Sequence, residues 1–451
     1  MDKGVDMCMN PFFRGALLLS TAALAGESLE FLINVVLANE LGEHNFGLYM
    51  AILPTLVFVV VLSSLELQVS VSKMVAEREN SEHISLLKAA LKLAIIVATT
   101  CLTAAFFILP NLPVLDHYHP LVKWMLILLI PIVTFSSVAR GYFVGAQHTK
   151  KIAVINLLKR GAQLTILYGV FKVFQFQSQT AIFVALGTVV LSEILVLFYM
   201  GTAFVIQINR LRKNEQKPIE NKEIYQSLLA VSLPTTGLRV FHAITFAVKP
   251  FLITTALSKA GLMEGMALIQ YGKLAGVAFT IGFFPAFIAH SLLTVMVPLV
   301  SSGYSKGDFH SLAKLLRQAM GVTFAYSLPV VMIFYFLAEP MTDLFFEHSP
   351  ASGYLTLLVP YFLFHYFAIP MQAYLIGIGL VREAFMHSVW STGVSFLLMF
   401  TLGSLPSLQM DGIIIGMNVG AVLLTLMHYL TITEKLGLTL VLTHSSKSRF
   451  K

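Results

Sequence analysis

Long apolar runs constrain this chain more than any other feature of its sequence. A helix needs about 20 apolar residues to cross the hydrocarbon core of a membrane. The runs are continuous, whereas the strands of a membrane β-barrel alternate apolar and polar residues. We therefore predict an all-α polytopic membrane protein of about twelve transmembrane helices. The twelve segments lie at 14–38, 47–71, 87–109, 121–143, 152–174, 180–207, 225–248, 273–300, 311–337, 352–378, 382–403 and 408–432.

Composition leads to the same class. The 451 residues are 57% hydrophobic and only 12% charged, about half of the roughly 25% charged residues in an average soluble protein. Charged side chains are too few to cover a globule of this length, so a soluble enzyme is excluded. The sequence also offers no nucleophile paired with a base, no metal-binding cysteine pattern and no glycine-rich phosphate loop. We expect no catalytic residues, no metal site and no cofactor.

Lysine and arginine are distributed unevenly over the loops. One alternating set carries nearly all of them, whereas the opposite set carries only Lys123, Lys172 and Lys259. Because cytoplasmic loops are enriched in positive charge, we predict a cell-membrane protein with both termini in the cytoplasm. The first run is expected to be a retained helix and not a cleaved signal peptide. The net charge of +7 then reflects topology and contact with membrane lipids, and nucleic acid is not an expected partner.

The chain divides near its middle into two related halves. The polar stretch around Arg210–Lys222 separates six predicted spans from six others. We expect an N-terminal bundle at 1–208, a cytoplasmic linker at 209–224, a C-terminal bundle at 225–434 and a cytoplasmic tail at 435–451. Short matches support a parallel repeat, for which a substrate site at the interface of the halves is typical. The matches pair Glu82–Lys88 with Asp308–Lys314, and Tyr142–Gly145 with Tyr374–Gly377.

Several ionisable residues fall inside the predicted spans. A charge at the bilayer centre costs roughly 2.5–3.5 kcal/mol on insertion scales, so some of these side chains must pair, reach an interface or face a watery cavity. They are Glu27, Glu30, Glu66, Glu193, Arg239, Lys249 and Lys273.

Helical periodicity arranges many of these groups into polar faces. The first span presents two carboxylates and an amide on one face, and the seventh presents a cationic stripe. Lys273 opens the predicted eighth span, which Pro285 is expected to kink. We predict a chamber between the bundles in which Arg239, Lys249 and Lys273 bind substrate. Residues for ion coupling or lining of the cavity are Glu27, Glu30, Asn34 and His242.

Structural alternatives exist for each group. Lys249 and Lys273 lie near predicted span ends, where their long stems can reach the interface. Either Glu27 or Glu30 can serve as a structural partner of Arg239. Glu66 and Glu193 lie closer to helix ends and are expected to be structural, and three isolated histidines are expected to be satisfied by packing. These are His290, His365 and His387.

A set of short motifs, in order along nearly the whole chain, resembles the stage V sporulation protein B branch of the polysaccharide exporters. That branch lies within the multidrug/oligosaccharidyl-lipid/polysaccharide (MOP) flippase superfamily. The resemblance implies a V-shaped pair of six-helix bundles that moves lipid-linked saccharides by alternating access. It also implies a Gram-positive endospore former and a role in building the spore envelope, with the forespore or spore membrane as a location. The motifs are Leu41–Tyr49, Ile52–Thr55, Val69–Glu77, Arg140–Gln147, Tyr271–Ala278, Phe284–Pro285, Ser291–Leu292 and Val297–Ser301.

The resemblance also suggests a role for one lysine. Related lipid II flippases carry a cavity-lining arginine near the start of the eighth span, and Lys273 looks like its counterpart. Two departures put the usual substrate in doubt: asparagines stand at Asn34 and Asn39 where relatives often have arginines, and Asn156–Arg160 replaces a glutamate-glutamine pair.

These observations predict a flippase for an undecaprenyl-pyrophosphate-linked saccharide or peptidoglycan precursor. The pyrophosphate is expected to dock against Lys273, with Arg239 and Lys249 assisting, and a proton or cation is a candidate coupling ion. The rival prediction is a cation-coupled multidrug antiporter of the same superfamily, whose cationic substrates favour a cavity dominated by carboxylates. A third alternative is a spore-membrane scaffold that transports nothing.

Overall fold

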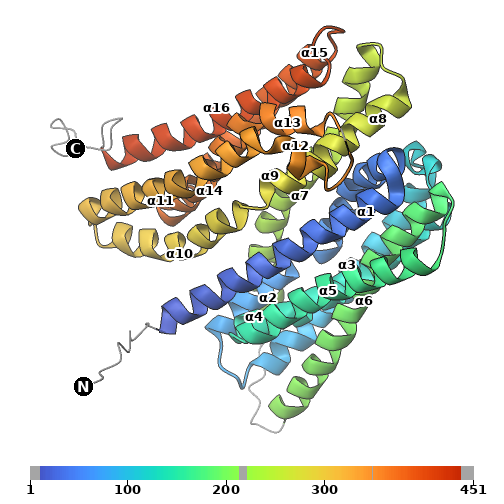
Figure 1. Ribbon diagram of the computed structural model, residues 1–451. Coiled ribbons are helices and arrows are strands. Elements are labelled where there is room, and N and C mark those ends of the chain that lie inside the picture. Colours follow the sequence, from blue (N-terminus) through green and yellow to red (C-terminus); the bar gives the residue numbers. More distant parts are fainter. Residues whose placement is uncertain (1–10, 213–220, 348, 438–451) are drawn as a thin grey trace, which may run out of the picture. The chain divides into compact units, whose positions relative to one another are not determined.

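The computed structural model describes residues 11–212, 221–347 and 349–437, and every regular element in these ranges is helical (Figure 1). The predicted all-α fold is confirmed. The described chain forms two compact units. Unit 1 combines the chain up to Phe31 with residues from Leu252 onward, and unit 2 comprises Leu32–Phe251.

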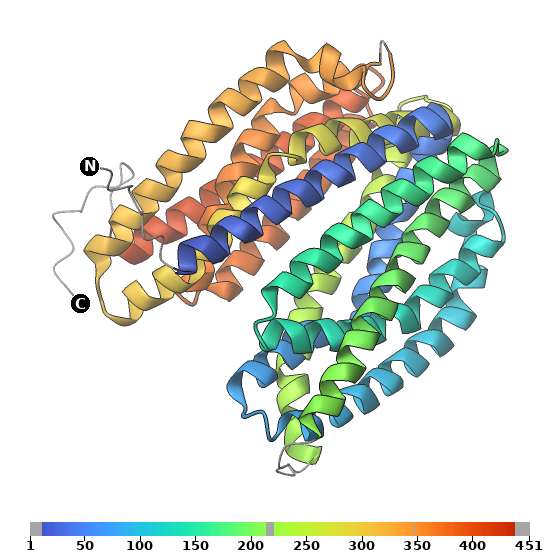
Figure 2. The same ribbon diagram turned by 60° about the horizontal axis from the view of Figure 1, so that its bottom comes forward.

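Unit 2 contains the second part of the long helix α1 (Pro11–Ser64) and the first part of α7 (Asn221–Lys259). Figures 1 and 2 show α4, α5 and α6 running alongside one another. Its core joins α2, α3, α4 and α6, and Ile224 and Leu228 at the start of α7 belong to that core. The other elements are α2 (Leu67–Glu77), α3 (His83–Ile108), η1 (Leu109–Asn111), η2 (Pro113–His117), α4 (Leu121–Gly145), α5 (Thr149–Val173) and α6 (Ser178–Leu211).

Unit 1 contains the first part of α1, the end of α7 and the remaining helices. Its core joins α10, α11, α14 and α16, and α15 packs along α16 (Figure 1). The elements are α8 (Glu264–Gly272), η3 (Lys273–Ala278), α9 (Phe279–Phe283), α10 (Ala286–Ser305), α11 (Phe309–Phe336), α12 (Ala338–Thr342), α13 (Ala351–Leu357), α14 (Val359–Gly377), α15 (Val381–Gly403) and α16 (Met410–Leu436).

Positive backbone φ angles divide the helices of the first two predicted spans. Gly42, at φ +71° and ψ 168°, interrupts α1 between them, a conformation that glycine adopts without a Cβ clash. Leu65 and Glu66, at φ +42° and +46°, separate α1 from α2. Non-glycine residues rarely occupy this left-handed region, so the second break is strained and turns the chain just where Glu66 sits.

Each of the twelve predicted spans coincides with helical structure. By length and composition, nine described stretches are apolar enough to cross a membrane, and a tenth is the pair α13–α14, bent by 51°. The first of the nine, Ala23–Glu77, contains most of the first predicted span and all of the second. The remaining predicted span is α5, which carries Lys159 and Arg160 in its interior.

The eighth span differs from its prediction in where it starts. Helix α8 begins at Glu264, so Lys273 lies inside the span instead of opening it. From Lys273 to Ala278 the helix takes the wider π form, labelled η3. The helix breaks at Phe284–Pro285, as expected for an internal proline.

The limits of the two units differ from the predicted bundle limits at 208 and 225, because the start of α1 packs in unit 1 and most of α7 in unit 2. Half of the predicted linker, at 213–220, and the tail from 438 lie outside the described residues. The bundle boundaries and linker remain predictions.

The sequence matches between the halves correspond to matching local structures. Helices α4 and α14 end at Gly145 and Gly377, and two residues later Gln147 and Gly379 both have positive φ. The backbone hydrogen bonds also agree, since His148 donates to Phe143 and Leu380 donates to Leu375. This six-to-one bond is the Schellman pattern that terminates many helices.

Close helix packing repeats as well. A Cβ added to Gly145 would lie 2.8 Å from Cβ of Val75 on α2, and one added to Gly377 would lie 2.7 Å from Cβ of Val300 on α10. Each glycine therefore allows a helix pair within its own unit to approach closely.

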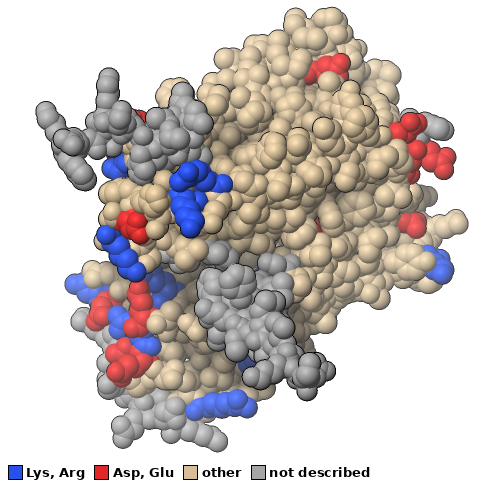
Figure 3. All heavy atoms as spheres, turned by 60° about the vertical axis from the view of Figure 1, so that its left-hand side comes forward, with Lys and Arg blue, Asp and Glu red and all other residues tan. Residues whose placement is uncertain are grey.

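Charged side chains are unevenly distributed over the surface of the protein. On the face in Figure 3 the visible lysine, arginine, aspartate and glutamate atoms gather toward two opposite edges, and a broad surface of other residues separates them. This distribution suits a multi-pass membrane protein, whose lipid-facing surface excludes charge.

Candidate functional site

The predicted acidic face of the first span lies on an unbroken part of α1. Glu27, Glu30 and Asn34 are half-buried there. Glu27 interacts electrostatically with His290 of α10, within unit 1. His290 is exposed, and the carboxylate of Glu27 joins the packing partners that were expected for this histidine. The Glu27 carboxylate and the His290 imidazole are thus neighbours within unit 1.

Lys273 occupies a distorted part of unit 1. Lys273 is only 6% exposed, whereas a lysine that extends its ammonium to the membrane interface keeps the charged end in water. It opens the π-helical segment η3, which packs against α13. Short π segments are frequent at functional sites because they reposition side chains relative to a regular helix.

Arg239 has a different partner from the one expected. Its Nη1 donates to Oε1 of Glu66 at 2.9 Å, within unit 2. The Glu66 side chain is 5% exposed and that of Arg239 is 59% exposed. The pairing of Arg239 with Glu27 or Glu30 stays a prediction, and the expectation that Glu66 is structural agrees with this bond. The strained turn at Leu65–Glu66 places this carboxylate beside α7, a contact that no helical periodicity predicts.

The other two predicted residues of α7 also lie in unit 2. His242 is exposed and interacts electrostatically with Arg239, one turn earlier. Lys249 is half-buried. The substrate-binding prediction therefore divides between the units, with Arg239 and Lys249 in unit 2 and Lys273 in unit 1.

A second charged cluster was missed in the sequence. Lys159 of α5 donates to Oε1 of Glu193 on α6, and Nη2 of Arg140 on α4 lies 3.9 Å from Oε2 of the same carboxylate. Nε and Nη2 of Arg140 are buried without a hydrogen bond. We define Arg140, Lys159 and Glu193 as the α4–α6 cluster.

Sequence reasoning assigned both cations of this cluster to topology. A usable signal was the depth of Lys159, which lies ten residues after the first residue of α5. At a rise of 1.5 Å per residue, this is about 15 Å from the helix end, too deep for a loop charge.

Two further histidines form a buried pair in unit 1. Nδ1 of His387 on α15 lies 2.9 Å from Nδ1 of His428 on α16, and Oγ1 of Thr431 lies 3.3 Å from Nε2 of His387. A hydrogen-bonding partner therefore accompanies the packing expected for His387. His365 does pack, stacking on Tyr361.

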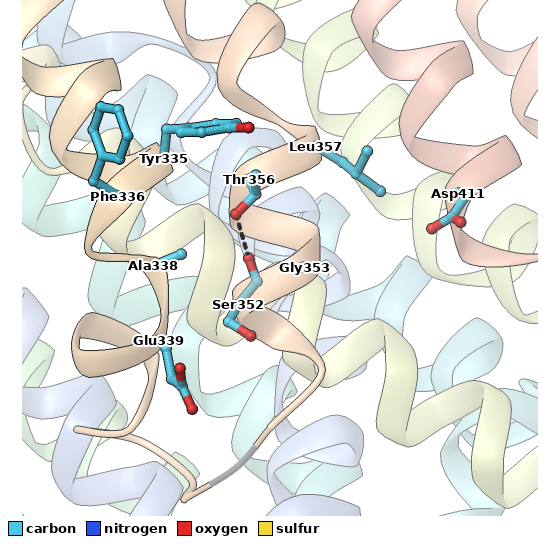
Figure 4. A pocket seen from close by; sticks show the side chains of 9 residues that line it. All are labelled: Tyr335, Phe336, Ala338, Glu339, Ser352, Gly353, Thr356, Leu357 and Asp411. Atoms are coloured by element: carbon cyan, nitrogen blue, oxygen red, sulfur yellow. Dashed lines mark hydrogen bonds between the residues drawn. The ribbon is translucent and has the colours of Figure 1, made fainter.

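An open pocket of about 610 Å³ lies on unit 1 (Figure 4). Its lining includes Tyr335, Glu339, Ser352, Thr356 and Asp411, and Thr356 donates a hydrogen bond to the backbone carbonyl of Ser352. None of the predicted site residues lines it. Among the residues that the structure describes, no group of three histidine, cysteine or acidic side chains is arranged to hold a metal ion.

Comparison with known families decides the class of this membrane protein. A family model described as "Polysaccharide biosynthesis protein" matches residues 12–304, well over half of the chain. The chain belongs to the polysaccharide biosynthesis protein family. A second family model, MatE, matches residues 272–401.

Two proteins of Bacillus subtilis (strain 168) resemble this family member over nearly its whole length. Sporulation protein YkvU is 46% identical over 440 residues, which cover 98% of this chain and 99% of YkvU. Stage V sporulation protein B is 29% identical over 444 residues, covering 96% of this chain and 86% of that protein. The resemblance drawn from short motifs is confirmed.

Solved structures share the fold at low sequence identity. An inward-facing multidrug resistance MATE family transporter of the MOP superfamily gives a TM-score of 0.72 at 17% identity, covering 91% of this chain and 94% of its own. A MOP superfamily transporter from Pyrococcus furiosus, described as having a binding pocket of reverse polarity, gives 0.64 at 16% identity, covering 97% and 98%. This chain thus combines membership of the polysaccharide biosynthesis protein family with the fold of the solved MATE transporters.

Proposed function

We propose that this family member is a flippase for an undecaprenyl-pyrophosphate-linked saccharide or peptidoglycan precursor, working by alternating access. The observation that carries the proposal is Lys273, a 6% exposed cation at the start of a π segment, in a chain of the polysaccharide biosynthesis protein family. A cation retained inside a membrane span is by default a functional group, because its desolvation is costly.

The pyrophosphate head docks against Lys273 while the prenyl tail stays in lipid. A lysine ammonium suits phosphate as a compact point charge, and an arginine guanidinium suits it as a planar double donor. Arg239 and Lys249 assist. Since Glu66 already binds Arg239, a phosphate that uses this guanidinium must compete with a buried carboxylate.

The membrane potential favours export of such a head group. Two negative charges moving outward through 100 mV, inside negative, release roughly 4–5 kcal/mol. Glu27, Glu30, Asn34 and His242 are the proposed residues for ion coupling or lining of the cavity. The interaction of Glu27 with His290 supports a proton as the coupling ion, because histidine is the side chain whose ordinary pKa lies closest to neutral pH.

The relatives support a cellular role and location for this protein. The names of two Bacillus subtilis relatives refer to sporulation, which supports a role in spore envelope formation and a location in the cell, forespore or spore membrane. Both termini are proposed to lie in the cytoplasm, and the halves are proposed to form bundles at 1–208 and 225–434.

A multidrug antiporter is the second candidate, because the MATE transporter fold matches over 91% of the chain. The two functions place opposite demands on charge. Export of a cation requires carboxylates at the substrate, whereas export of a pyrophosphate requires cations.

Transport by the purified full-length protein in liposomes separates these candidates. Labelled undecaprenyl-pyrophosphate saccharide is expected to cross with the wild type and to slow strongly with Lys273→Gln. Lys172→Gln, on the predicted outer end of α5, is the control matched in charge. Unchanged lipid transport in Lys273→Gln contradicts the docking role, and extrusion of cationic dyes without lipid transport supports the antiporter instead.

A further inference from the structure

The α4–α6 cluster holds more positive than negative charge in the interior of unit 2. Arg140 and Lys159 share one carboxylate, Glu193. The Arg140, Lys159 and Glu193 side chains are 22%, 28% and 13% exposed, respectively, so they are largely desolvated. A formal charge of +1 therefore remains on the group, which is unfavourable within a membrane-spanning unit.

The hydrogen bonding of Arg140 is also incomplete. Its Nε and Nη2 are buried with no acceptor, and Nη2 is 3.9 Å from the nearest oxygen of Glu193. That distance permits charge attraction but exceeds the 2.7–3.2 Å of a hydrogen bond. Buried donors are almost always satisfied. The two unsatisfied nitrogens of Arg140 therefore indicate that an acceptor is missing.

The two nitrogens are Nε and one Nη, which lie in the plane of the guanidinium. An oxyanion with two adjacent oxygens matches such a pair of donors. A carboxylate already present, Glu193, is bound to Lys159. The acceptor that best completes the cluster is therefore a second oxyanion with several oxygens and at least one negative charge, which describes a phosphate.

We propose that Arg140 and Lys159 form a phosphate-binding subsite within unit 2, and that Glu193 is the internal competitor that offsets one of their two positive charges while the subsite is empty. The proposal rests on the function proposed above, since it supplies a second docking place for the phosphate head of the transported lipid. When phosphate enters, Lys159 and Arg140 exchange the carboxylate for phosphate oxygens.

A purely structural role for the cluster predicts different behaviour. If Glu193 only ties α5 to α6, replacing it by glutamine lowers stability and leaves anion binding unchanged. If Glu193 competes with phosphate, the same replacement lowers the stability of the empty protein, because two cations lose their counter-charge, but strengthens anion binding. The sign of the effect on binding separates the two roles.

The test uses the full-length protein in lipid nanodiscs and two probes, inorganic pyrophosphate and undecaprenyl pyrophosphate. Dissociation constants and melting temperatures are measured for the wild type, Arg140→Gln, Lys159→Gln, Glu193→Gln and the control Lys172→Gln. Loss of one charge-assisted hydrogen bond is expected to weaken binding about tenfold or more in Arg140→Gln and Lys159→Gln. Glu193→Gln is expected to bind several-fold more tightly, and Lys172→Gln as the wild type does.

Each outcome either supports or overturns the proposed subsite. Unchanged affinity in Arg140→Gln and Lys159→Gln, or weaker binding in a folded Glu193→Gln, overturns it. Binding of the lipid probe alone assigns the subsite to a lipid head group, and equal binding of both probes assigns it to the phosphate groups themselves; either supports it. Failure of lipid transport with intact probe binding counts against the proposed function and leaves the subsite standing.

Discussion

Two intramembrane cations of unit 2 are each bound by a carboxylate. Glu66 binds Arg239 and Glu193 binds Lys159, in each case across different helices. A buried charge is tolerated only when it is paired and hydrogen-bonded. The Glu66 and Arg239 side chains differ greatly in exposure, at 5% and 59%, so the two halves of this ion pair are not equivalent.

Removal of Arg239 is expected to cost more stability than removal of its partner. Arg239→Gln leaves the buried carboxylate of Glu66 without its guanidinium, a loss of about 1–3 kcal/mol for an unsatisfied buried group. Glu66→Gln leaves Arg239, which is 59% exposed, free to reach solvent, so we expect a smaller loss. The free energy of unfolding in detergent measures both. A larger loss in Glu66→Gln contradicts this account.

Asp308 is expected to make the start of α11 sensitive to acid. Hydrogen bonds from the Ser311 hydroxyl and backbone N–H lower the pKa of this exposed carboxyl below its ordinary 3.8. A lowered pKa in the folded state means stabilisation that is present above the unfolded pKa and is lost as pH falls through the folded one. The melting temperature of Asp308→Ala should therefore fall below the wild type near neutral pH, with the gap closing under strong acid. A gap independent of pH contradicts the role of the charge.

Paired glycines at the ends of α4 and α14 set the helix spacing in both units. Gly145 faces Val75, and Gly377 faces Val300, at distances that leave no room for a methyl group. The same hydrogen-bond pattern closes both helices. The internal repeat is thus seen as the same helix packing in both units.

Alanine at either glycine is expected to destabilise the protein by about 1–3 kcal/mol, because an added methyl group overpacks a close helix contact. Gly201→Ala in α6 is the matched control, since nothing lies within 4 Å of the added Cβ and alanine favours helix. Unfolding free energies of the three variants give the comparison. Equal effects at Gly145 and Gly201 rule out the packing role.

At the scale of the whole molecule, the distribution of lysine and arginine predicts the orientation in the membrane. The loops that carry most of the lysine and arginine residues are expected on the cytoplasmic side. The loop that contains η2 is expected on the outer side of the membrane. Orientation decides the direction in which a flippase must move its cargo, so it bears directly on function.

Labelling of single cysteines tests this orientation. In a background with Cys8 and Cys101 replaced by serine, His117→Cys should react with a membrane-impermeant thiol reagent in intact cells. Asn80→Cys, exposed at the predicted inner end of α2, should react only after permeabilisation. The reverse pattern inverts the proposed topology.

Much of this protein follows from its sequence. Apolar length determined the helices, because a chain in lipid must satisfy its backbone hydrogen bonds within each span. Periodicity placed Glu27, Glu30 and Asn34 on one face of α1, and short motifs indicated the family. These features depend on residues near one another in the chain, so they can be predicted without a structure.

Only the tertiary structure decided which charges meet. Arg239 and Glu66 are 173 positions apart, and Lys159 and Glu193 are 34 apart, so no helical period relates them. The strained turn at Leu65–Glu66 and the π segment at Lys273 are likewise decided by packing, since neither follows from local propensity. Pairing between distant charges depends on the positions of whole helices, and those positions are set by the cores that the helices share.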